Sequence, residues 1–536
     1  MKRYDFSKKN IIGIVDRKNR EEDFCGYPCF TMDSISPESC DCVLISSHSY
    51  HQAIKEELES LHIPCIDFYD ELEKQGIRLD LPYQYYEKYE IYPQLIVNYL
   101  YLRYLRSEAG PQREIALNEL LQAAVEYKDF VLISNIYQDC GGEAGEFPIL
   151  KTVWRKSAHL QDCIQSKLQE RKQKDIILFW TDLVPYNRFH YFPNMMELSK
   201  QGTFFQRAHT PAAYTNPVFR AMFRNMLPID DFPQNQEKID SENSSLIQFM
   251  EREGYKVWLV GSSERAMGKE HLVEADGDYE PCSSKWWKGM VDLLQSSEPC
   301  FYIFHFMESH EPQYVPTLKE LVNLNVATEA QVEDQIKSAY EYLDQCLLLY
   351  HSLLGDKTQI FLSDHGWDTT VRFEEQALHP YCFAVGKDIP KITVTRFFSY
   401  TNFEKFVRWI VDPIRFSLDD ACEDEVVIQD TDFYHPLLID RVIQYLSDRP
   451  EHGLAYRGIA TYDYKYAINS LGDEFFYQIQ PDGSEKLVPL EDPVLRAELR
   501  EKVGTKFLDI YQYDKFLYTR KLYEVINQKR RGGNAT

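Results

Sequence analysis

Acidic and imidazole side chains stand at the ends of two apolar runs that lie far apart in the sequence. Asp182 closes the run DIILFWTD, and Asp364 and His365 close the run QIFLSDHG. In an open α/β sheet, ligands bind beyond the carboxyl ends of the strands. If these runs are neighbouring strands, two carboxylates and an imidazole meet there and form a cation site. Zinc, manganese and magnesium are the candidate ions, and calcium is a further one.

A hydroxyl that such a cation could activate lies between the two runs, in AAYTNPVFRAMF. Thr215 stands just before a stretch that reads as helical from Pro217 onward. A hydroxyl at a helix start gains from the backbone N–H groups and the helix dipole, and beside a divalent cation it loses its proton more easily. It could then attack a phosphorus or sulfur centre. Thr is also a common helix N-cap, and the residue pattern taken alone favours that structural role.

Further candidate ligands follow a third apolar run, in FYIFHFMESHEPQY. His305, Glu308 and His310 are candidates for a second metal site or for binding the oxyanions of a substrate, and His379 in ALHPYCFAVG is a fourth. A single histidine is usually structural, whereas two histidines and an acid close to one strand end favour a site.

The elements needed to position these residues are visible from Lys174 onward. Apolar runs that predict buried strands alternate with amphipathic segments that predict helices. This alternation predicts an α/β fold with a large doubly wound sheet over residues 173–525, including a C-terminal subdomain from about residue 420. The predicted strands are DIILFWTD, GYKVWLVG, CFYIFHFM and TQIFLSDHG, and the longest predicted helix is ATEAQVEDQIKSAYEYLDQCLLLYHSLLG.

Two other segments precede this domain. Residues 1–82 alternate the short runs NIIGIVD, CVLISS and PCIDFYD with an amphipathic helix, which predicts a small parallel sheet of βαβ type. The segment resembles the Rossmann-like domains that precede enzymes of bacterial surface-sugar metabolism. It lacks the glycine fingerprint of nucleotide binding, so a structural or docking role fits at least as well. Residues 83–172 carry helical apolar spacing and predict a helical connector.

Composition narrows the class of partner. The 536 residues carry a formal net charge of −25, which argues against a nucleic-acid binder and against binding to anionic membranes. No run reaches the apolar length of a transmembrane helix, and no signal peptide is visible at the start. The 12 cysteines lack metal-site spacing and read as reduced thiols. Together these features predict a cytoplasmic protein.

The order of the motifs resembles that of the alkaline phosphatase superfamily. More narrowly, it is similar to the branch of sulfatases and phosphoethanolamine or phosphoglycerol transferases. Within that branch, PNMMELSKQGTFF resembles P-N-L-x-x-L-x-x-x-G-x-x-F, and AYRGIATYDYKYAINSLGDEFFYQI resembles the C-terminal sulfatase signature. The resemblance spans about residues 174 to 520, and its motifs follow in the order Asp182, PNMMELSKQGTFF, Thr215, HFMESHEPQY and LSDHG.

The resemblance implies roles for individual residues. Asp182, Asp364 and His365 would hold a divalent metal, and Thr215 would stand at the position of the nucleophile. The residues implied to contact the transferred group or a second ion are His310, His305 and His379.

Two departures from the family pattern bear on the substrate. Sulfatases carry Cys or Ser in C/S-x-P-x-R, whereas this chain has TNPVFR, with Thr215 at the Cys position and Arg220 one place late. Thr cannot be converted to formylglycine, so phosphate esters are favoured over sulfate esters. Many sulfatases also begin with two adjacent acids, whereas Leu183 follows Asp182 here, as in single-metal transferases.

These observations favour a metal-dependent hydrolase or transferase that acts on a small-molecule, glycan-linked or lipid-linked phosphate ester. Bacterial surface polysaccharide or glycolipid precursors are the expected substrates, by analogy with the N-terminal segment. Thr215 would attack the ester, and water or an acceptor hydroxyl would then displace it, with His310 as proton donor. The alternative is a non-catalytic sulfatase-like protein that binds or senses sugar phosphates.

Overall fold

The computed structural model covers the whole chain and divides it into two compact units. The first unit comprises Met1–Ile91 with Asn323–Val326, and the second comprises Tyr92–Val322 with Ala327–Thr536. The residues that the structure describes are 10–15, 23–24, 27–46, 51–68, 93–107, 110–140, 147–231, 237–261, 266–273, 280–319, 328–366, 372–431, 443, 446, 448–480, 484–512 and 517–532.

The first unit contains two small sheets in its described part. One is three-stranded and places β3 (Tyr27–Phe30) between β1 (Ile14–Val15) and β2 (Asp23–Phe24). In the other, β4 (Val43–Ile45) and β5 (Cys65–Asp67) pair in parallel and are joined by α1 (His51–Ser60). The βαβ unit is therefore present, but the described strands do not form the single sheet that the sequence predicts. The Rossmann-like assignment stays a prediction.

The second unit begins with a layer of four helices. Leu117, Leu120 and Ile136 are fully buried within this layer, which confirms the predicted helical character of this part of the chain. The predicted boundaries of a separate connector stay a prediction. The helices are α3 (Pro93–Arg106), α4 (Pro111–Glu126), α5 (Phe130–Asp139) and α6 (Pro148–Glu170).

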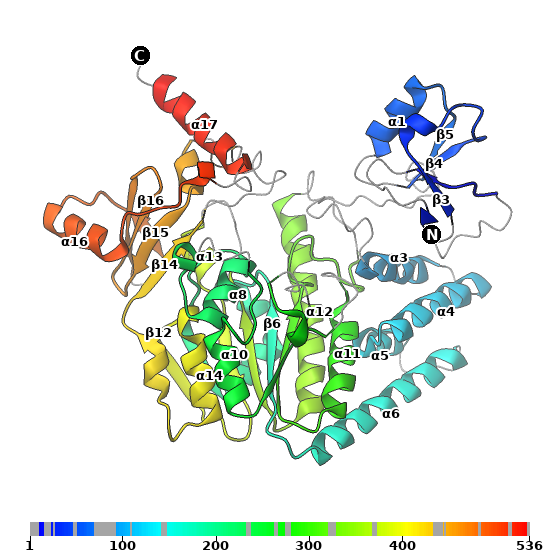
Figure 1. The fold of residues 1–536 in the computed structure, drawn as a ribbon. Helices are drawn as coiled ribbons and strands as arrows, with labels where there is room; N and C mark the ends of the chain where they lie inside the picture. The colour runs from blue at the N-terminus through cyan, green and yellow to red at the C-terminus, as the bar shows by residue number, and fades with distance from the viewer. Residues whose placement is uncertain are drawn as a thin grey trace. The chain divides into compact units, whose positions relative to one another are not determined.

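An eight-stranded mixed sheet forms the centre of the second unit (Figure 1). Its order is β13-β12-β7-β11-β10-β6-β9-β8. The central strand β6 pairs in parallel with β10 on one side and with β9 on the other, whereas β11 and β13 run antiparallel to their neighbours. The predicted α/β fold with a large sheet is confirmed. The strands are β6 (Ile176–Thr181), β7 (Thr203–His209), β8 (Lys256–Val260), β9 (Cys300–Phe306), β10 (Thr358–Ser363), β11 (Cys382–Val385), β12 (Ile392–Ser399) and β13 (Cys422–Glu423).

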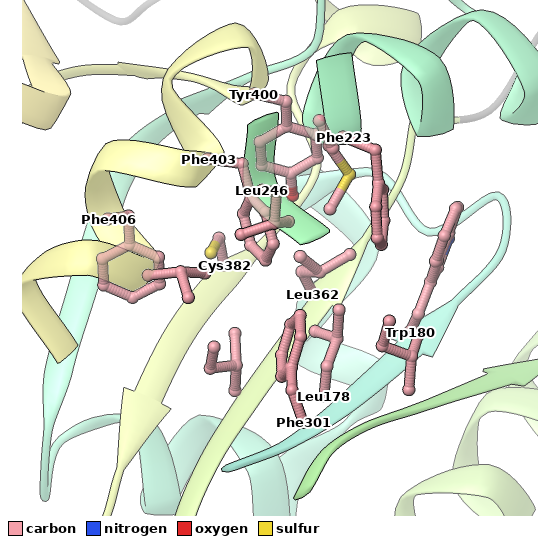
Figure 2. Packing of buried hydrophobic residues seen from close by; sticks show 14 of the residues in the cluster. Leu178, Trp180, Phe223, Leu246, Phe301, Leu362, Cys382, Tyr400, Phe403 and Phe406 are labelled. Atoms are coloured by element: carbon pink, nitrogen blue, oxygen red, sulfur yellow. The ribbon is translucent and has the colours of Figure 1, made fainter. Parts of the chain in front are cut away.

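Helices cover both faces of this sheet. Alternate side chains of a strand point to opposite faces, so each strand packs against helices on both sides. Leu178 and Trp180 of β6 pack with side chains of α8 (Thr215–Arg224), α10 (Ser245–Arg252) and α14 (Phe403–Val411), as Figure 2 shows in part. Phe179 lies on the other face, against Trp286 of α11 (Cys282–Gln295) and Tyr350 of α12 (Glu329–Leu354). Burial on both faces explains why β6 reads as a continuous apolar run.

A second sheet closes the chain. It is an antiparallel meander in the order β14-β15-β16-β17-β18. Its strands are β14 (Val426–Asp430), β15 (Tyr456–Ala460), β16 (Tyr464–Asn469), β17 (Glu474–Ile479) and β18 (Glu485–Leu487), followed by α16 (Pro493–Val503) and α17 (Leu517–Gly532). Across the described part of the chain, none of the helices combines the length and the apolar character needed to span a bilayer.

Candidate metal and nucleophile site

The site lies where three parallel strands end together. In the register of the sheet, Thr181 is opposite Phe306 of β9 and Ser363 of β10. Asp182 and Asp364 each follow the last residue of their strand, so the two carboxylates reach the same edge of the sheet. The strands that end at Asp182 and Asp364 are therefore neighbours, as the predicted cation site requires.

A buried group that could hold a metal ion occupies this edge. Ligand atoms of Asp182, His305 and Asp364 all lie within 4.8 Å of one another, and these residues are at most 1% exposed. His365 Nε2 lies 3.6 Å from Asp182 Oδ1 and 3.6 Å from Asp364 Oδ2. The predicted ligands thus come together, and His305, predicted for a second site, belongs to the same group.

The donor atoms fit a divalent cation. Asp182 Oδ1 and Asp364 Oδ2 are buried, and neither finds a hydrogen-bond partner among the described residues. Buried carboxylate oxygens without a donor are costly unless a cation or proton is present. His365 Nδ1 lies 2.9 Å from Gly366 O, and donation of its N–H to that carbonyl leaves a lone pair on Nε2, as in metal-ligating histidines.

The two carboxylates have different electrostatic surroundings. Burial alone would raise the pKa of Asp182, but the imidazoles of His310, His305 and His365 outweigh that effect and hold the pKa well below its usual range. Burial raises the pKa of Asp364, and the charge of Asp182 beside it raises that pKa further. Asp182 is therefore the carboxylate that stays ionised most readily.

The Thr215 hydroxyl is directed at this group. Its Oγ1 donates a hydrogen bond to Asp182 Oδ2 at 3.0 Å, and His305 Nε2 lies 3.2 Å from the same oxygen. Thr215 is the first residue of α8, Tyr214 is the N-cap, and no side chain caps the helix. The capping role favoured by the residue pattern is therefore wrong. The hydroxyl lies at the positive end of the helix dipole, beside a buried carboxylate.

His310 also belongs to the surroundings of this site. Among the neighbouring imidazoles, its charge lowers the pKa of Asp182 most. Its Nδ1 is 2.7 Å from Glu311 O, so the N–H on Nδ1 is engaged by a backbone carbonyl. Proton exchange with a substrate would then use Nε2.

Glu308 does not fit the predicted second site. Its Oε1 accepts hydrogen bonds from the backbone N of Cys282, at 2.7 Å, and from Gln94 Nε2, at 3.2 Å. Cys282 is the first residue of α11, so Glu308 supplies an acceptor to the start of that helix. Its Oε1 thus satisfies a helix end, its Oε2 is buried without a hydrogen-bond partner among the described residues, and Glu308 lies outside the group of Asp182, His305 and Asp364.

His379 likewise makes contacts that do not fit a metal ligand. Its Nδ1 lies 3.0 Å from Glu375 Oε1, and its Nε2 lies 3.0 Å from the backbone oxygen of Gln206. The ring stacks on Tyr186 with a centroid distance of 4.5 Å. Because both ring nitrogens face protein oxygens, neither lone pair is presented to the Asp182 group.

The contact of Trp180 with the site was missed in the sequence. The indole of Trp180 lies against His305, with ring centroids 4.5 Å apart, because these residues are opposite one another in β6 and β9. Arg220, one place late in the family pattern, is buried and forms an ion pair with Asp231, so it does not join the cation group. The strand register is the signal that would have placed His305, and it requires the order of the strands.

The comparisons with known proteins match the part of the chain that contains this site. A family model described as Sulfatase matches residues 181–371. No curated protein matches the chain. One similar solved structure is a protein of the alkaline phosphatase superfamily from Vibrio parahaemolyticus, with 12% identity over 66% of this chain and 88% of that chain, at a TM-score of 0.46.

Two phosphonate monoester hydrolases are also similar in structure. The protein from Silicibacter pomeroyi has 11% identity over 63% of this chain and 97% of that chain, at a TM-score of 0.47. The protein from Agrobacterium radiobacter has 12% identity over 67% and 96%, at a TM-score of 0.42. At such identities and TM-scores these proteins say nothing about the substrate of this chain. The family match includes Thr215, His305 and Asp364 and begins one residue before Asp182, so residues 181–371, which carry the cation group, are similar to the sulfatase family.

Proposed function

We propose that this protein is a metal-dependent hydrolase or transferase of phosphate esters in which Thr215 is the nucleophile. The observation that supports this most directly is the hydrogen bond of 3.0 Å from Thr215 Oγ1 to Asp182 Oδ2, within the buried group that could hold a cation. A hydroxyl at a helix start that donates to an ionised carboxylate is placed to lose its proton and to attack.

Asp182, Asp364 and His365 would hold the cation, with His305 beside them. A bound divalent ion supplies positive charge at the transferred group and lowers the pKa of the neighbouring hydroxyl. Side chains and backbone of the protein orient the nucleophile and stabilise the charge that develops on it. Asp182 orients the Thr215 hydroxyl, and the N-terminus of α8 favours the negative charge that develops there.

The reaction then has two balanced steps. In the first, Thr215 gives its hydroxyl proton to Asp182 Oδ2, and its Oγ forms a bond to phosphorus. The bond from phosphorus to the leaving alcohol breaks, and the alcohol takes a proton from His310 Nε2. In the second, water or an acceptor hydroxyl forms a bond to phosphorus and gives a proton back to His310. The bond from phosphorus to Thr215 Oγ breaks, and Thr215 takes its proton back from Asp182.

The substrate class is part of the proposal. Threonine at the nucleophile position favours phosphate over sulfate esters, since it cannot form the aldehyde hydrate of sulfatases. The resemblance of the N-terminal segment to domains that precede surface-sugar enzymes favours a glycan-linked or lipid-linked phosphate ester.

The test compares the wild-type protein with Thr215→Ala and Thr215→Ser on chromogenic phosphodiesters, phosphomonoesters and sulfate esters, each with Mn, Zn, Mg and Ca. We expect turnover of a phosphate ester by the wild type, partial turnover by Thr215→Ser and none by Thr215→Ala, which should still bind metal. Rapid acid quench and mass spectrometry should find one phosphoryl group on Thr215. Unchanged turnover by Thr215→Ala would refute the role of this residue. Metal binding without turnover of any ester would instead support a binding or sensor protein.

A further inference from the structure

We propose that Arg372 and Asp430 are positioning residues that hold Tyr214, and through it the Thr215 hydroxyl, in the reactive arrangement. This inference rests on the proposed role of Thr215 as the nucleophile. It gives the C-terminal sheet a part in the reaction, although that sheet contributes no residue to the cation group.

Arg372 packs directly on the residue before the nucleophile. Its Cζ lies 4.0 Å from the centroid of the Tyr214 ring, and Arg372 is fully buried. A guanidinium over an aromatic face is attracted by the ring, and the attraction is strongest where water is excluded. Tyr214 is the N-cap of α8, so the position of its backbone sets where Thr215 begins the helix.

The Tyr214 ring also approaches the cation group. Its centroid is 6.5 Å from that of His365. One side chain therefore contacts Arg372, stands near a predicted metal ligand and directly precedes the nucleophile. A shift of this ring would move the Thr215 hydroxyl relative to Asp182 while leaving the carboxylates on their strands.

The end of β14 holds Arg372 in place. Arg372 Nη1 donates to the backbone oxygen of Thr431 and lies 3.6 Å from Asp430 Oδ2. From the other side, the hydroxyl of Tyr456 in β15 donates to the backbone oxygen of Arg372 at 2.6 Å. The end of β14 thus holds the guanidinium and β15 holds the backbone of Arg372, so both come from outside the central sheet.

The same strand end also binds the backbone that leads to Tyr214. The backbone N of Ala213 donates to Asp430 Oδ2 at 3.4 Å, and the backbone N of Gln429 donates to Pro211 O at 2.8 Å. The segment 211–214 is thus fixed by backbone contacts and by the stacked guanidinium together. Placing a reactive group within a fraction of an ångström requires this kind of support.

Direct binding of the substrate by Arg372 does not fit the structure. Its guanidinium is engaged by the Tyr214 ring, the Thr431 carbonyl and the Asp430 carboxylate. An arginine that bound a substrate anion would direct its N–H donors at that anion. Arg372 therefore acts through Tyr214.

The test measures kcat, KM and Mn²⁺ affinity on bis-para-nitrophenyl phosphate for Arg372→Met and Tyr214→Leu. Arg457→Met is the matched control, because Arg457 lies in β15 of the same sheet and bonds to Asp230 and Lys506 instead. We expect kcat to fall about 10- to 100-fold in both test variants, since small misplacements of a reacting group have effects of this size. KM and Mn²⁺ affinity should stay within about twofold of the wild type, as expected when an interaction used in the transition state is lost.

Tyr214→Leu keeps the inference testable if Arg372→Met fails to fold, because it leaves no buried charge unpaired. The rate of phosphoryl transfer to Thr215 in a single turnover should fall in parallel with kcat, whereas Arg457→Met should lower the melting temperature only. Wild-type kcat in a folded Tyr214→Leu or Arg372→Met variant, with Thr215→Ala inactive, would overturn the positioning role alone. An active Thr215→Ala variant, or a wild-type protein inactive on every ester, would overturn the proposed function and this inference with it.

Discussion

Replacing Asp129 by Asn should change how the stability of the protein depends on pH. Asp129 is 3% exposed and lies at the N-cap of α5. Its Oδ1 accepts a hydrogen bond from the backbone N of Leu132 at 2.9 Å, and its Oδ2 accepts one from the hydroxyl of Tyr342 in α12. The carboxylate thus joins the helical layer to a helix that packs on the central sheet.

Burial raises the pKa of Asp129 to about 6, from an ordinary value of 3.8. The folded protein then binds the proton more tightly than the unfolded chain does, so this group favours folding at low pH. The favourable contribution is full below pH 3.8 and is lost as the pH rises to about 6. A difference of about two pKa units corresponds to about 3 kcal/mol of unfolding free energy.

Asn is the informative substitution, since it caps a helix as well as Asp does and carries no charge. We expect the unfolding free energy of Asp129→Asn, relative to the wild type, to rise by up to about 3 kcal/mol between pH 4 and pH 7. Urea unfolding and melting temperatures at several pH values would measure it, with Asp139→Asn, on the exposed end of the same helix, as the control. If the difference in unfolding free energy between Asp129→Asn and the wild type does not depend on pH, the reasoning is refuted. If that difference falls as the pH rises, the pKa of Asp129 is lowered by folding and not raised.

Two further predictions concern the cation group and its support. Asp182→Asn should weaken the binding of Mn²⁺ or Zn²⁺ by at least about 10- to 100-fold, the effect of losing a residue that only supports a metal ligand. Calorimetry would measure the affinity, with Asp139→Asn as the control. An affinity equal to that of the wild type would show that Asp182 is not a ligand. Asp231→Asn should destabilise the protein by about 3–5 kcal/mol, because it leaves the buried Arg220 and the half-buried Arg224 without their carboxylate. Chemical unfolding would measure that loss, and an unchanged stability would contradict it.

The cation group could be predicted from the sequence because ligands in open α/β sheets bind beyond the carboxyl ends of the strands. Asp182 and Asp364 each follow a run of buried strand residues, and parallel strands bring such ends to one edge of a sheet. Only the adjacency of the two runs had to be assumed, and β6 and β10 are adjacent. His305 was assigned to a second site because the register of β9 against β6 cannot be obtained from one run alone.

The predicted positions that differ from the structure have a common physical cause. Glu308 and His379 lie at the correct edge of the sheet, but their partners are a backbone N of α11 and the side chain of Glu375, which no local pattern reveals. Thr215 was favoured as a cap because capping and first-turn positions differ by a single residue. The stacking of Arg372 on Tyr214 depends on how the C-terminal sheet packs against the loop before α8, which is a tertiary contact between distant segments.

The contact between Trp180 and His305 gives the site an intrinsic optical signal. The indole is fully buried, and the imidazole, whose ring centroid is 4.5 Å from that of the indole, belongs to the cation group. An excited indole loses emission to a nearby imidazolium far more readily than to a neutral ring. The fluorescence of Trp180 should therefore be weaker when the His305 ring is positively charged than when it is neutral.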